Sequence, residues 1–270
     1  MDRNMKEICK DIRCDIMTCI GHLGVGHIGG CLSIVELLAV LYFEEMNIDP
    51  AQPKMEGRDR FICSKGHAGP AVYSTLALKG YFPMEMLKTL NKPGTNLPSH
   101  CDMNRTPGID MTTGSLGQGA SSAMGICAAN RLKGYDNYTY LVLGDGEIEE
   151  GQVWEAAMFA AHCDLDNLIA IVDNNNLQID GDVRDVVGLA EIPAKFKAFG
   201  WEVIEVNGHD APALLEAFAA AKAVEGKPVC IVAATTKGKG VSFMENQAGW
   251  HGKAPNAEQT EQAIAELKGE

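Results

Sequence analysis

Two polar turns follow apolar runs in this sequence, and their residue types suit a bound metal ion. The first is Gly-Asp-Gly at 144–146, and about thirty residues later the second is Asp-Asn-Asn-Asn at 173–176. A carboxylate, an amide oxygen and a backbone carbonyl form the all-oxygen ligand set that suits octahedral Mg²⁺, whereas Zn²⁺ prefers His or Cys. Asp145 and Asn175 are therefore candidate Mg²⁺ ligands. The alternative is that both only form turns, as these residue types often do.

The glycines of the first turn suit a bound phosphate, because glycine lets a ligand approach the backbone closely. A helical pattern begins soon after Gly146. The N-terminus of a helix offers unpaired N–H groups and the positive end of its dipole to an anion. The first turn therefore predicts an anion bound beside the metal ion.

These turns must be positioned by a parallel sheet. Nearly continuous apolar runs, typical of strands covered on both faces, alternate with helical patterns. The runs are 138–146, 167–175, 201–210 and 227–236, and a shorter strand is expected within 58–69. This alternation predicts an α/β fold with a doubly wound, mostly parallel sheet flanked by helices. Ligands bind beyond the carboxyl ends of such strands, so Asp145 and Asn175 are expected to converge.

Helical patterns also occupy the first half of the chain. Apolar residues at three- and four-residue spacing predict a core-facing helix over 5–20. Ser33, with Glu36 three residues on, matches a capping box and predicts that Ser33 is the N-cap of the next helix. Pro70 suits the first turn of a later helix. The segment 91–119 has no such period, and loops of this length are uncommon unless they are functional.

The charge and the cysteine pattern exclude several classes of protein. The 270 residues carry 36 acidic and 23 basic side chains, a formal charge of −13, which opposes binding to nucleic acid. The nine cysteines include no C-x-x-C pair and are expected to be reduced thiols that pack as small apolar residues. No stretch reaches the roughly eighteen apolar residues of a membrane span. We therefore expect one large cytoplasmic domain with no nucleic-acid or membrane partner.

The two turns also carry a family resemblance. Gly-Asp-Gly followed about thirty residues later by a strand that ends in Asn-Asn resembles the thiamine diphosphate-binding motif. A longer series of motifs resembles the transketolases and extends over nearly the whole chain. In order, these are GVGHIGG, RDRF, SKGHA, LPSH, TTGSLGQG, DNYTYLVLGDGEIEEG, IDG and WHGKAP. The resemblance implies the thiamine-diphosphate-binding fold, with residues 1–270 as a single diphosphate-binding domain.

The resemblance implies a set of cofactor and metal ligands. The cofactors would be thiamine diphosphate and Mg²⁺, with Ca²⁺ or Mn²⁺ able to replace Mg²⁺. Asp145, Asn175 and the main-chain carbonyl of Leu177 would bind the metal ion, while Gly146 and His67 would contact the diphosphate. The residues that would meet the aminopyrimidine side of the cofactor are Gly114, Ser115 and Leu116.

Four histidines lie on loops marked by Gly or Pro, where a rigid scaffold presents side chains to ligands. They are His27, His67, His100 and His251. Taken singly, each also suits a solvated or hydrogen-bonded role. The resemblance implies that His27, His100 and His251 hydrogen-bond sugar oxygens and transfer protons, with His251 also at the cofactor. Glu150 matches a catalytic acid of the family that lies toward a partner chain.

The sequence departs from the transketolase pattern in composition and in length. Val25 and Ile28 stand in the motif that is usually S-G-H-P-G, and Cys101 and Asp102 follow PSH in place of Pro-Glu. Single-chain transketolases also continue into a pyrimidine-binding domain and a C-terminal domain. The resemblance therefore implies the N-terminal subunit of a split transketolase. Its partner subunit would carry the pyrimidine-binding domain with the activating glutamate, in an α2β2 assembly.

The resemblance implies a transferase of carbohydrate metabolism, as in the pentose phosphate reactions. It would move a two-carbon ketol unit from a ketose phosphate to an aldose phosphate, and only with its partner. One alternative is another thiamine diphosphate ketol transferase or synthase, either a transketolase for an unusual sugar or a deoxyxylulose-phosphate-synthase-like enzyme. Another is a non-catalytic cofactor-binding partner. Gly24-x-Gly26-x-x-Gly29 matches the dinucleotide fingerprint but follows a helical pattern, so we reject a dinucleotide site.

Overall fold

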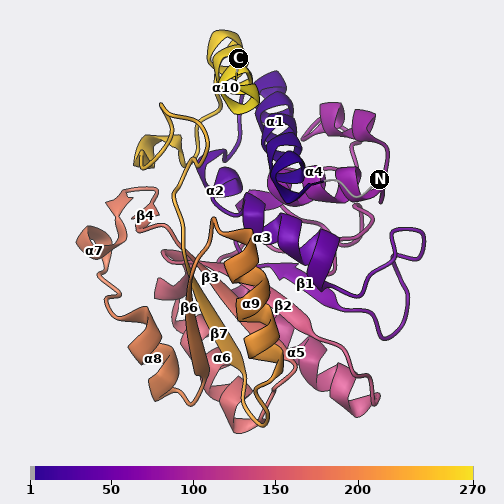
Figure 1. The fold of residues 1–270 in the computed structure, drawn as a ribbon, viewed down its shortest axis with the longest axis vertical. Helices are drawn as coiled ribbons and strands as arrows, with labels where there is room; N and C mark the ends of the chain where they lie inside the picture. Colours follow the sequence, from indigo (N-terminus) through magenta and orange to yellow (C-terminus); the bar gives the residue numbers. More distant parts are fainter. Residues whose placement is uncertain (1–3, 270) are drawn as a thin grey trace.

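A parallel five-stranded sheet forms the centre of the computed structural model, which describes residues 4–269 (Figure 1). The strands are β1 (Arg60–Cys63), β2 (Thr139–Gly144), β3 (Leu168–Asn174), β6 (Glu202–Asn207) and β7 (Val229–Ala234). Their order is β1-β2-β3-β7-β6, and every neighbouring pair is parallel. The predicted α/β fold is confirmed, and each predicted strand coincides with one of these five.

Helices cover both faces of the sheet, and each face has its own apolar core (Figure 1). The first core joins the sheet to α1 (Met5–Leu23), α3 (Val35–Val40), α4 (Gly69–Lys79), α9 (Ala211–Lys222) and α10 (Ala257–Lys268). The second joins it to α5 (Gln118–Leu132), α6 (Gly151–His162) and α8 (Ile192–Ala198). The sheet is therefore buried on both sides.

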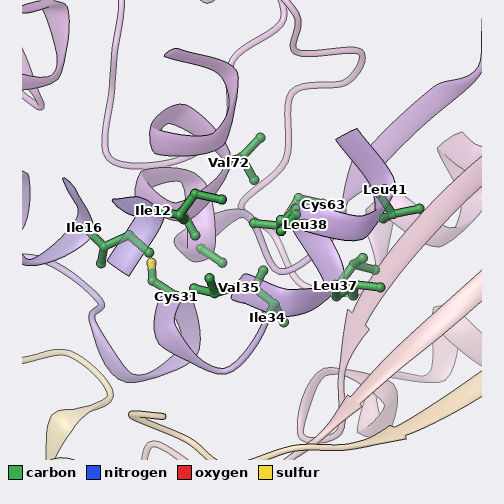
Figure 2. Close-up of a cluster of buried hydrophobic side chains, with 14 of the residues drawn as sticks. Ile12, Ile16, Cys31, Ile34, Val35, Leu37, Leu38, Leu41, Cys63 and Val72 are labelled. Atoms are coloured by element: carbon green, nitrogen blue, oxygen red, sulfur yellow. The ribbon is translucent and has the colours of Figure 1, made fainter. Parts of the chain in front are cut away.

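Alternate residues of each strand feed the two cores. Tyr140 and Val142 of β2 belong to the first core, whereas Leu141 and Leu143 belong to the second. This period of two follows from strand geometry and explains why the buried strands are continuous apolar runs in the sequence. Figure 2 shows part of the first core, where side chains of α1, α3 and α4 pack together.

Short elements connect these layers. The helical ones are α2 (Gly29–Leu32), η1 (Leu41–Glu45), η2 (Gly66–Ala68), η3 (Met84–Thr89), η4 (Glu147–Glu149), α7 (Val183–Val186) and η5 (Ala248–Trp250). β4 (Leu177–Gln178) and β5 (Gly181–Asp182) form a small antiparallel pair. Pro70 lies in the first turn of α4, as predicted. The predicted loop contains neither helix nor strand over 91–117, and α5 then begins at Gln118.

Two local predictions are wrong. Ser33 is not the N-cap of a helix, because α2 ends at Leu32 and α3 begins only at Val35. The Ser33 hydroxyl instead donates to Asp173 Oδ2 at 2.7 Å and to the Gly30 carbonyl at 3.2 Å. The Ser33 hydroxyl therefore donates to a buried carboxylate instead of capping a helix. The strand β6, at one edge of the sheet, is also only partly buried, whereas β1 at the other edge is buried at three of its four residues.

All nine cysteines are free thiols, and seven of them are buried. Their packing as small apolar side chains is confirmed for those seven. Burial raises the pKa of the Cys230 thiol well above its ordinary value, which keeps this thiol protonated. Among residues 4–269, no helix is long and apolar enough to cross a membrane.

Candidate active site

A pocket of about 280 Å³ opens at the carboxyl ends of β1, β2 and β3. Ten of the twelve predicted site residues line it. They are His27, His67, His100, Gly114, Leu116, Asp145, Gly146, Asn175, Leu177 and His251. Parallel strands deliver their carboxyl ends to one edge of the sheet, so residues that are far apart in the sequence meet here.

Two predicted residues lie outside this lining. Ser115 is exposed, and Glu150 is the exposed N-cap of α6. Glu150 nevertheless borders the turn before α5, because a Cβ atom placed on Gly117 would lie 3.1 Å from the Glu150 Cβ. The roles expected for Ser115 and Glu150 stay predictions.

Asp145 follows the end of β2, and the backbone holds its carboxylate in place. Oδ1 accepts a hydrogen bond from the Gly146 N–H at 2.9 Å, and Oδ2 accepts one from the Asn176 N–H. Burial, and then the neighbouring Asp173 carboxylate, raises the pKa of Asp145 to about 7. Asp145 thus presents an oriented carboxylate whose charge changes near neutral pH.

Asn175 and Leu177 present two further oxygen atoms. The Asn175 Nδ2 donates to Asp173 Oδ2 at 3.1 Å, and the Asn175 Oδ1 accepts from the Leu177 N–H at 3.1 Å. The Leu177 carbonyl accepts from the Lys237 ammonium at 2.7 Å. This carbonyl is therefore turned toward a cationic group within the pocket.

This set of oxygen donors fits a hard divalent cation. Asp145, Asn175 and Leu177 offer a carboxylate, an amide and a backbone carbonyl oxygen to the same pocket, which is the chemistry that Mg²⁺ and Ca²⁺ prefer. Within residues 4–269, no group of three or more His, Cys, Asp or Glu side chains could hold a metal ion. A magnesium ion here would complete its shell with phosphate and water oxygens.

The four predicted histidines form one cluster within the pocket. The His27 ring centroid lies 5.2 Å from that of His67, 5.7 Å from that of His100 and 5.5 Å from that of His251. Burial is the main cause that lowers the pKa of all four. Burial and then the Lys237 charge lower the pKa of His251 to about 3. Near pH 7 these rings are therefore neutral, and each offers one donor and one acceptor nitrogen.

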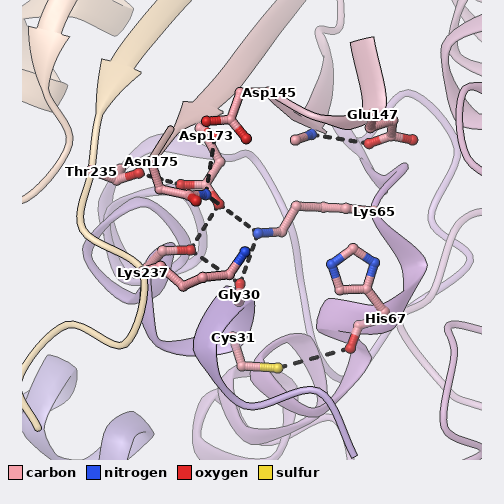
Figure 3. A network of polar contacts seen from close by, with 12 residues as sticks. Gly30, Cys31, Lys65, His67, Asp145, Glu147, Asp173, Asn175, Thr235 and Lys237 are labelled. Atoms are coloured by element: carbon pink, nitrogen blue, oxygen red, sulfur yellow. Dashed lines mark hydrogen bonds and ion pairs between the residues drawn. The ribbon is translucent and has the colours of Figure 1, made fainter. Parts of the chain in front are cut away.

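A buried polar network lies beneath the candidate metal ligands (Figure 3). The Lys65 ammonium donates to Asp173 Oδ2 at 2.6 Å and to the Gly30 carbonyl at 2.7 Å. The Thr235 hydroxyl donates to the other Asp173 oxygen. Lys65 and then Thr235 and Ser33 hold the pKa of Asp173 below its ordinary value despite burial. Asp173 is therefore a carboxylate at neutral pH.

Glu147 joins the turn before α5 to the end of β2. Its carboxylate accepts from the Ser64 hydroxyl at 2.6 Å, from the Gly117 N–H at 2.9 Å and from the Gly144 N–H at 3.0 Å. Burial raises the pKa of Glu147, and these three hydrogen bonds oppose that shift. Glu147 therefore holds the segment that contains Leu116 against the strand end that precedes Asp145.

Two glycines let neighbouring loops approach each other at the pocket. A Cβ atom on Gly66 would lie only 2.7 Å from the Gly114 nitrogen. Gly114 itself has a φ of 153°, a conformation that side chains rarely adopt. The close contact places the loop that carries His67 against the turn that carries Leu116.

Four charged residues of the pocket lining were not predicted from the sequence. They are Lys65, Glu147, Asp173 and Lys237. Each lies within three residues of the carboxyl end of a strand or is part of that end. That position was the available signal, because ligands bind at this edge of a parallel sheet.

Comparison with known proteins identifies the family. The family model described as transketolase, thiamine diphosphate binding domain, matches residues 4–268. The chain belongs to the transketolase family, and the matched residues form its thiamine diphosphate-binding domain. The predicted resemblance is thereby confirmed.

Individual relatives agree with this assignment. The 6-deoxy-6-sulfo-D-fructose transketolase subunit SqwG of Clostridium sp. (strain MSTE9) is 53% identical over 93% of this chain and 91% of its own. An apulose-4-phosphate transketolase subunit of Phocaeicola vulgatus is 43% identical over 90% of this chain and 86% of its own. The solved transketolase of Leishmania mexicana matches with a TM-score of 0.93 at 34% identity, covering 98% of this chain and 41% of that one. These relatives support both the fold and the family.

Proposed function

We propose that this chain is the thiamine diphosphate-binding subunit of a transketolase that moves a two-carbon ketol unit from a ketose phosphate to an aldose phosphate. The observation that carries the proposal is the pocket itself, where oxygen donors for a divalent cation and four clustered histidines lie together. Membership of the transketolase family and relatives named as transketolase subunits support the same class of reaction.

One end of the pocket would bind the cofactor through a metal ion. Asp145, Asn175 and the Leu177 carbonyl would hold Mg²⁺, with Ca²⁺ or Mn²⁺ as substitutes. Gly146 and His67 would contact the diphosphate. Bound thiamine diphosphate supplies the carbon nucleophile that carries the two-carbon unit, which no protein side chain provides. The protein therefore contributes binding and orientation at this end.

The histidines would act on the sugar. A neutral imidazole donates a hydrogen bond to a hydroxyl or carbonyl oxygen through one nitrogen and accepts a proton at the other. The lowered pKa values of His27, His100 and His251 keep the accepting nitrogen free at pH 7. These three residues are the proposed proton-transfer groups of the pocket.

A partner subunit would complete the site. Leu116 and Ile179 line the pocket and are 38% and 62% exposed, and α6 exposes Met158 and Phe159. Exposed apolar side chains, such as Leu116 and Ile179 at the pocket, are typical of an interaction surface. We propose that a C-terminal transketolase subunit, which carries the pyrimidine-binding domain, binds here within an α2β2 assembly. Glu150 would face that subunit.

A transketolase for an unusual sugar is the second candidate. Two of the relatives named above are called transketolase subunits for sugars of this kind, a sulfosugar and apulose 4-phosphate. Val25 and Cys101, which depart from the usual motifs, immediately precede Gly26-His27 and follow His100. The substitutions therefore lie beside two of the histidines that would contact the sugar.

The test is glycolaldehyde transfer to an aldose phosphate. Xylulose 5-phosphate and 6-deoxy-6-sulfo-D-fructose would each serve as donor, for this chain alone, with its candidate partner subunit, and with the Asp145→Ala variant. We expect activity only when both subunits are present, and loss of activity in the variant. Robust turnover by the lone chain, or full activity of Asp145→Ala, would refute the proposal. Transfer from the sulfosugar but not from xylulose 5-phosphate would select the second candidate.

A further inference from the structure

We infer that Lys65 and Asp173 are positioning residues that turn the Asn175 side-chain oxygen toward the metal ion. The inference rests on the proposed function, because it needs Asn175 to be a metal ligand. Neither residue need touch the cofactor for this role. Figure 3 shows Lys65, Asp173 and Asn175 joined by hydrogen bonds beside Asp145.

The Asp173 carboxylate accepts hydrogen bonds from side chains of four segments that meet at the pocket. Its Oδ2 accepts from the Ser33 hydroxyl, the Lys65 ammonium and the Asn175 amide, and its Oδ1 accepts from the Thr235 hydroxyl. These donors come from the segment after α2, from the ends of β1 and β3, and from the end of β7. One buried anion thus sets the relative positions of the strand ends on which the site depends.

The orientation of the Asn175 amide follows from this anion. A carboxylate attracts an N–H group and repels an amide oxygen, so Nδ2 must face Asp173 and Oδ1 must face away from it. Oδ1 also accepts from the Leu177 N–H at 3.1 Å, which fixes the same orientation from the other side. Without the carboxylate, the amide loses one of the groups that select this orientation.

The Lys65 ammonium pairs with Asp173 Oδ2 at 2.6 Å, and both side chains are almost completely buried. Its second hydrogen bond, to the Gly30 carbonyl, ties the segment next to His27 to the same carboxylate. Residues that orient metal ligands from behind typically change metal affinity by about 10–100-fold when they are replaced. A purely structural ion pair would change the stability of the fold without this effect.

The test compares two double variants with apolar side chains of similar size. Lys65→Met/Asp173→Leu removes the proposed positioning pair. Arg58→Met/Asp110→Leu removes a second buried ion pair of the chain, which does not line the pocket. Replacing both partners of a buried ion pair by apolar residues often leaves stability unchanged or improved, so both variants should fold. Asp173→Asn, which preserves size, is the milder variant if the double one fails to fold.

The measurement is Mn²⁺ affinity from the electron paramagnetic resonance signal of free Mn²⁺, at saturating thiamine diphosphate. The full chain is used, both alone and with its partner subunit. We expect Lys65→Met/Asp173→Leu to weaken Mn²⁺ binding about 10–100-fold, and Asp173→Asn to weaken it by a smaller factor. The Arg58→Met/Asp110→Leu control should bind within about twofold of the wild type. In an Asn175→Ala background, the Lys65→Met/Asp173→Leu change should add nothing.

The outcomes separate this inference from the proposed function. Wild-type Mn²⁺ affinity in folded Lys65→Met/Asp173→Leu, or in folded Asp173→Asn if that is the variant tested, would overturn the positioning role alone. So would an equal further loss in the Asn175→Ala background, because the effect would then not pass through Asn175. Absence of Mn²⁺ binding by the wild-type chain, with and without its partner, would overturn both the positioning role and the proposed function.

Discussion

The two ends of β1 each carry a buried ion pair, and they serve different purposes. Arg58 lies two residues before the strand and pairs with Asp110, with both side chains 5% exposed. Lys65 lies two residues after the strand and pairs with Asp173, with side chains 2% and 0% exposed. Burial and charge are thus nearly the same at the two ends.

The two ion pairs differ in the other groups that their side chains contact. The Arg58 guanidinium also donates to the carbonyls of Pro53 and Asp59, and Asp110 also accepts from the Phe61 N–H. That pair anchors a loop to the start of the strand. Asp173 instead contacts Asn175, a candidate metal ligand. Burial of an ion pair therefore does not by itself indicate a function. The other residues that its two side chains contact do.

Breaking either pair at one partner should have the largest effect. Lys65→Met leaves the buried Asp173 carboxylate without its cation, and Arg58→Met leaves Asp110 with only the partly exposed Arg60. Removing one partner of a buried ion pair typically costs about 3–5 kcal/mol of the free energy of unfolding. Urea unfolding of the ligand-free chain measures this cost. A loss below about 1 kcal/mol at either end would show that the two pairs are not energetically alike.

The next largest effect is expected in the pH dependence of Mn²⁺ affinity. It should depend on the pocket at the carboxyl end of β1 and not on the ion pair at the amino end. The pKa of Asp145 is raised to about 7, so protons compete with a metal ion below that pH. We expect Mn²⁺ affinity to fall about tenfold for each pH unit below 7. Arg58→Met/Asp110→Leu should keep this dependence, and Asp145→Asn should bind weakly and lose it. A flat profile for the wild type would contradict the assigned role of Asp145.

A smaller effect is expected from the neutral histidines at the pocket end. The pKa of His251 is lowered from about 6.5 to about 3, so the unfolded chain takes up a proton before the folded chain does. The contribution of His251 to stability is then complete above pH 6.5 and is lost as the pH falls from 6.5 toward 3. Partial exposure keeps the slope below about 1.4 kcal/mol per pH unit. His251→Gln should lose less stability than the wild type between pH 7 and pH 5 in urea unfolding, and equal losses would contradict this.

The smallest effect is expected from replacing Arg60, the second basic residue that contacts Asp110 at the amino end of β1. Arg60 contacts Asp110 at 3.2 Å, and its side chain is partly exposed. Arg60→Met should therefore cost no more than about 1 kcal/mol in urea unfolding and should leave Mn²⁺ affinity unchanged. A weakened Mn²⁺ affinity would show that the amino end of β1 also influences the pocket.

The sheet and most of the pocket could be predicted from local sequence patterns. Apolar runs that end in Gly-Asp-Gly and Asp-Asn-Asn-Asn define strand ends, and parallel strands place Asp145 beside Asn175. Histidines on glycine-marked loops were found by the same local signals. Family resemblance added the carbonyl of Leu177, which no side-chain pattern can reveal.

The polar network beneath the pocket could not be predicted, because it depends on contacts distant in the sequence. Ser33 matched a helix cap locally, but its hydroxyl donates to Asp173, 140 residues away. Lys65 and Asp173 are 108 residues apart, and no local rule pairs them. No motif in the sequence around Lys237 indicates a role in the site. Only the fold brings its ammonium to the Leu177 carbonyl.

A crystal structure with thiamine diphosphate and Mg²⁺, grown from this chain with its partner subunit, tests the central claim most directly. We predict one cation bound by the Asp145 carboxylate, the Asn175 side-chain oxygen and the Leu177 carbonyl, with the diphosphate on its far side. A cation bound at another place, or an Asn175 amide that turns its nitrogen toward the cation, would contradict the account.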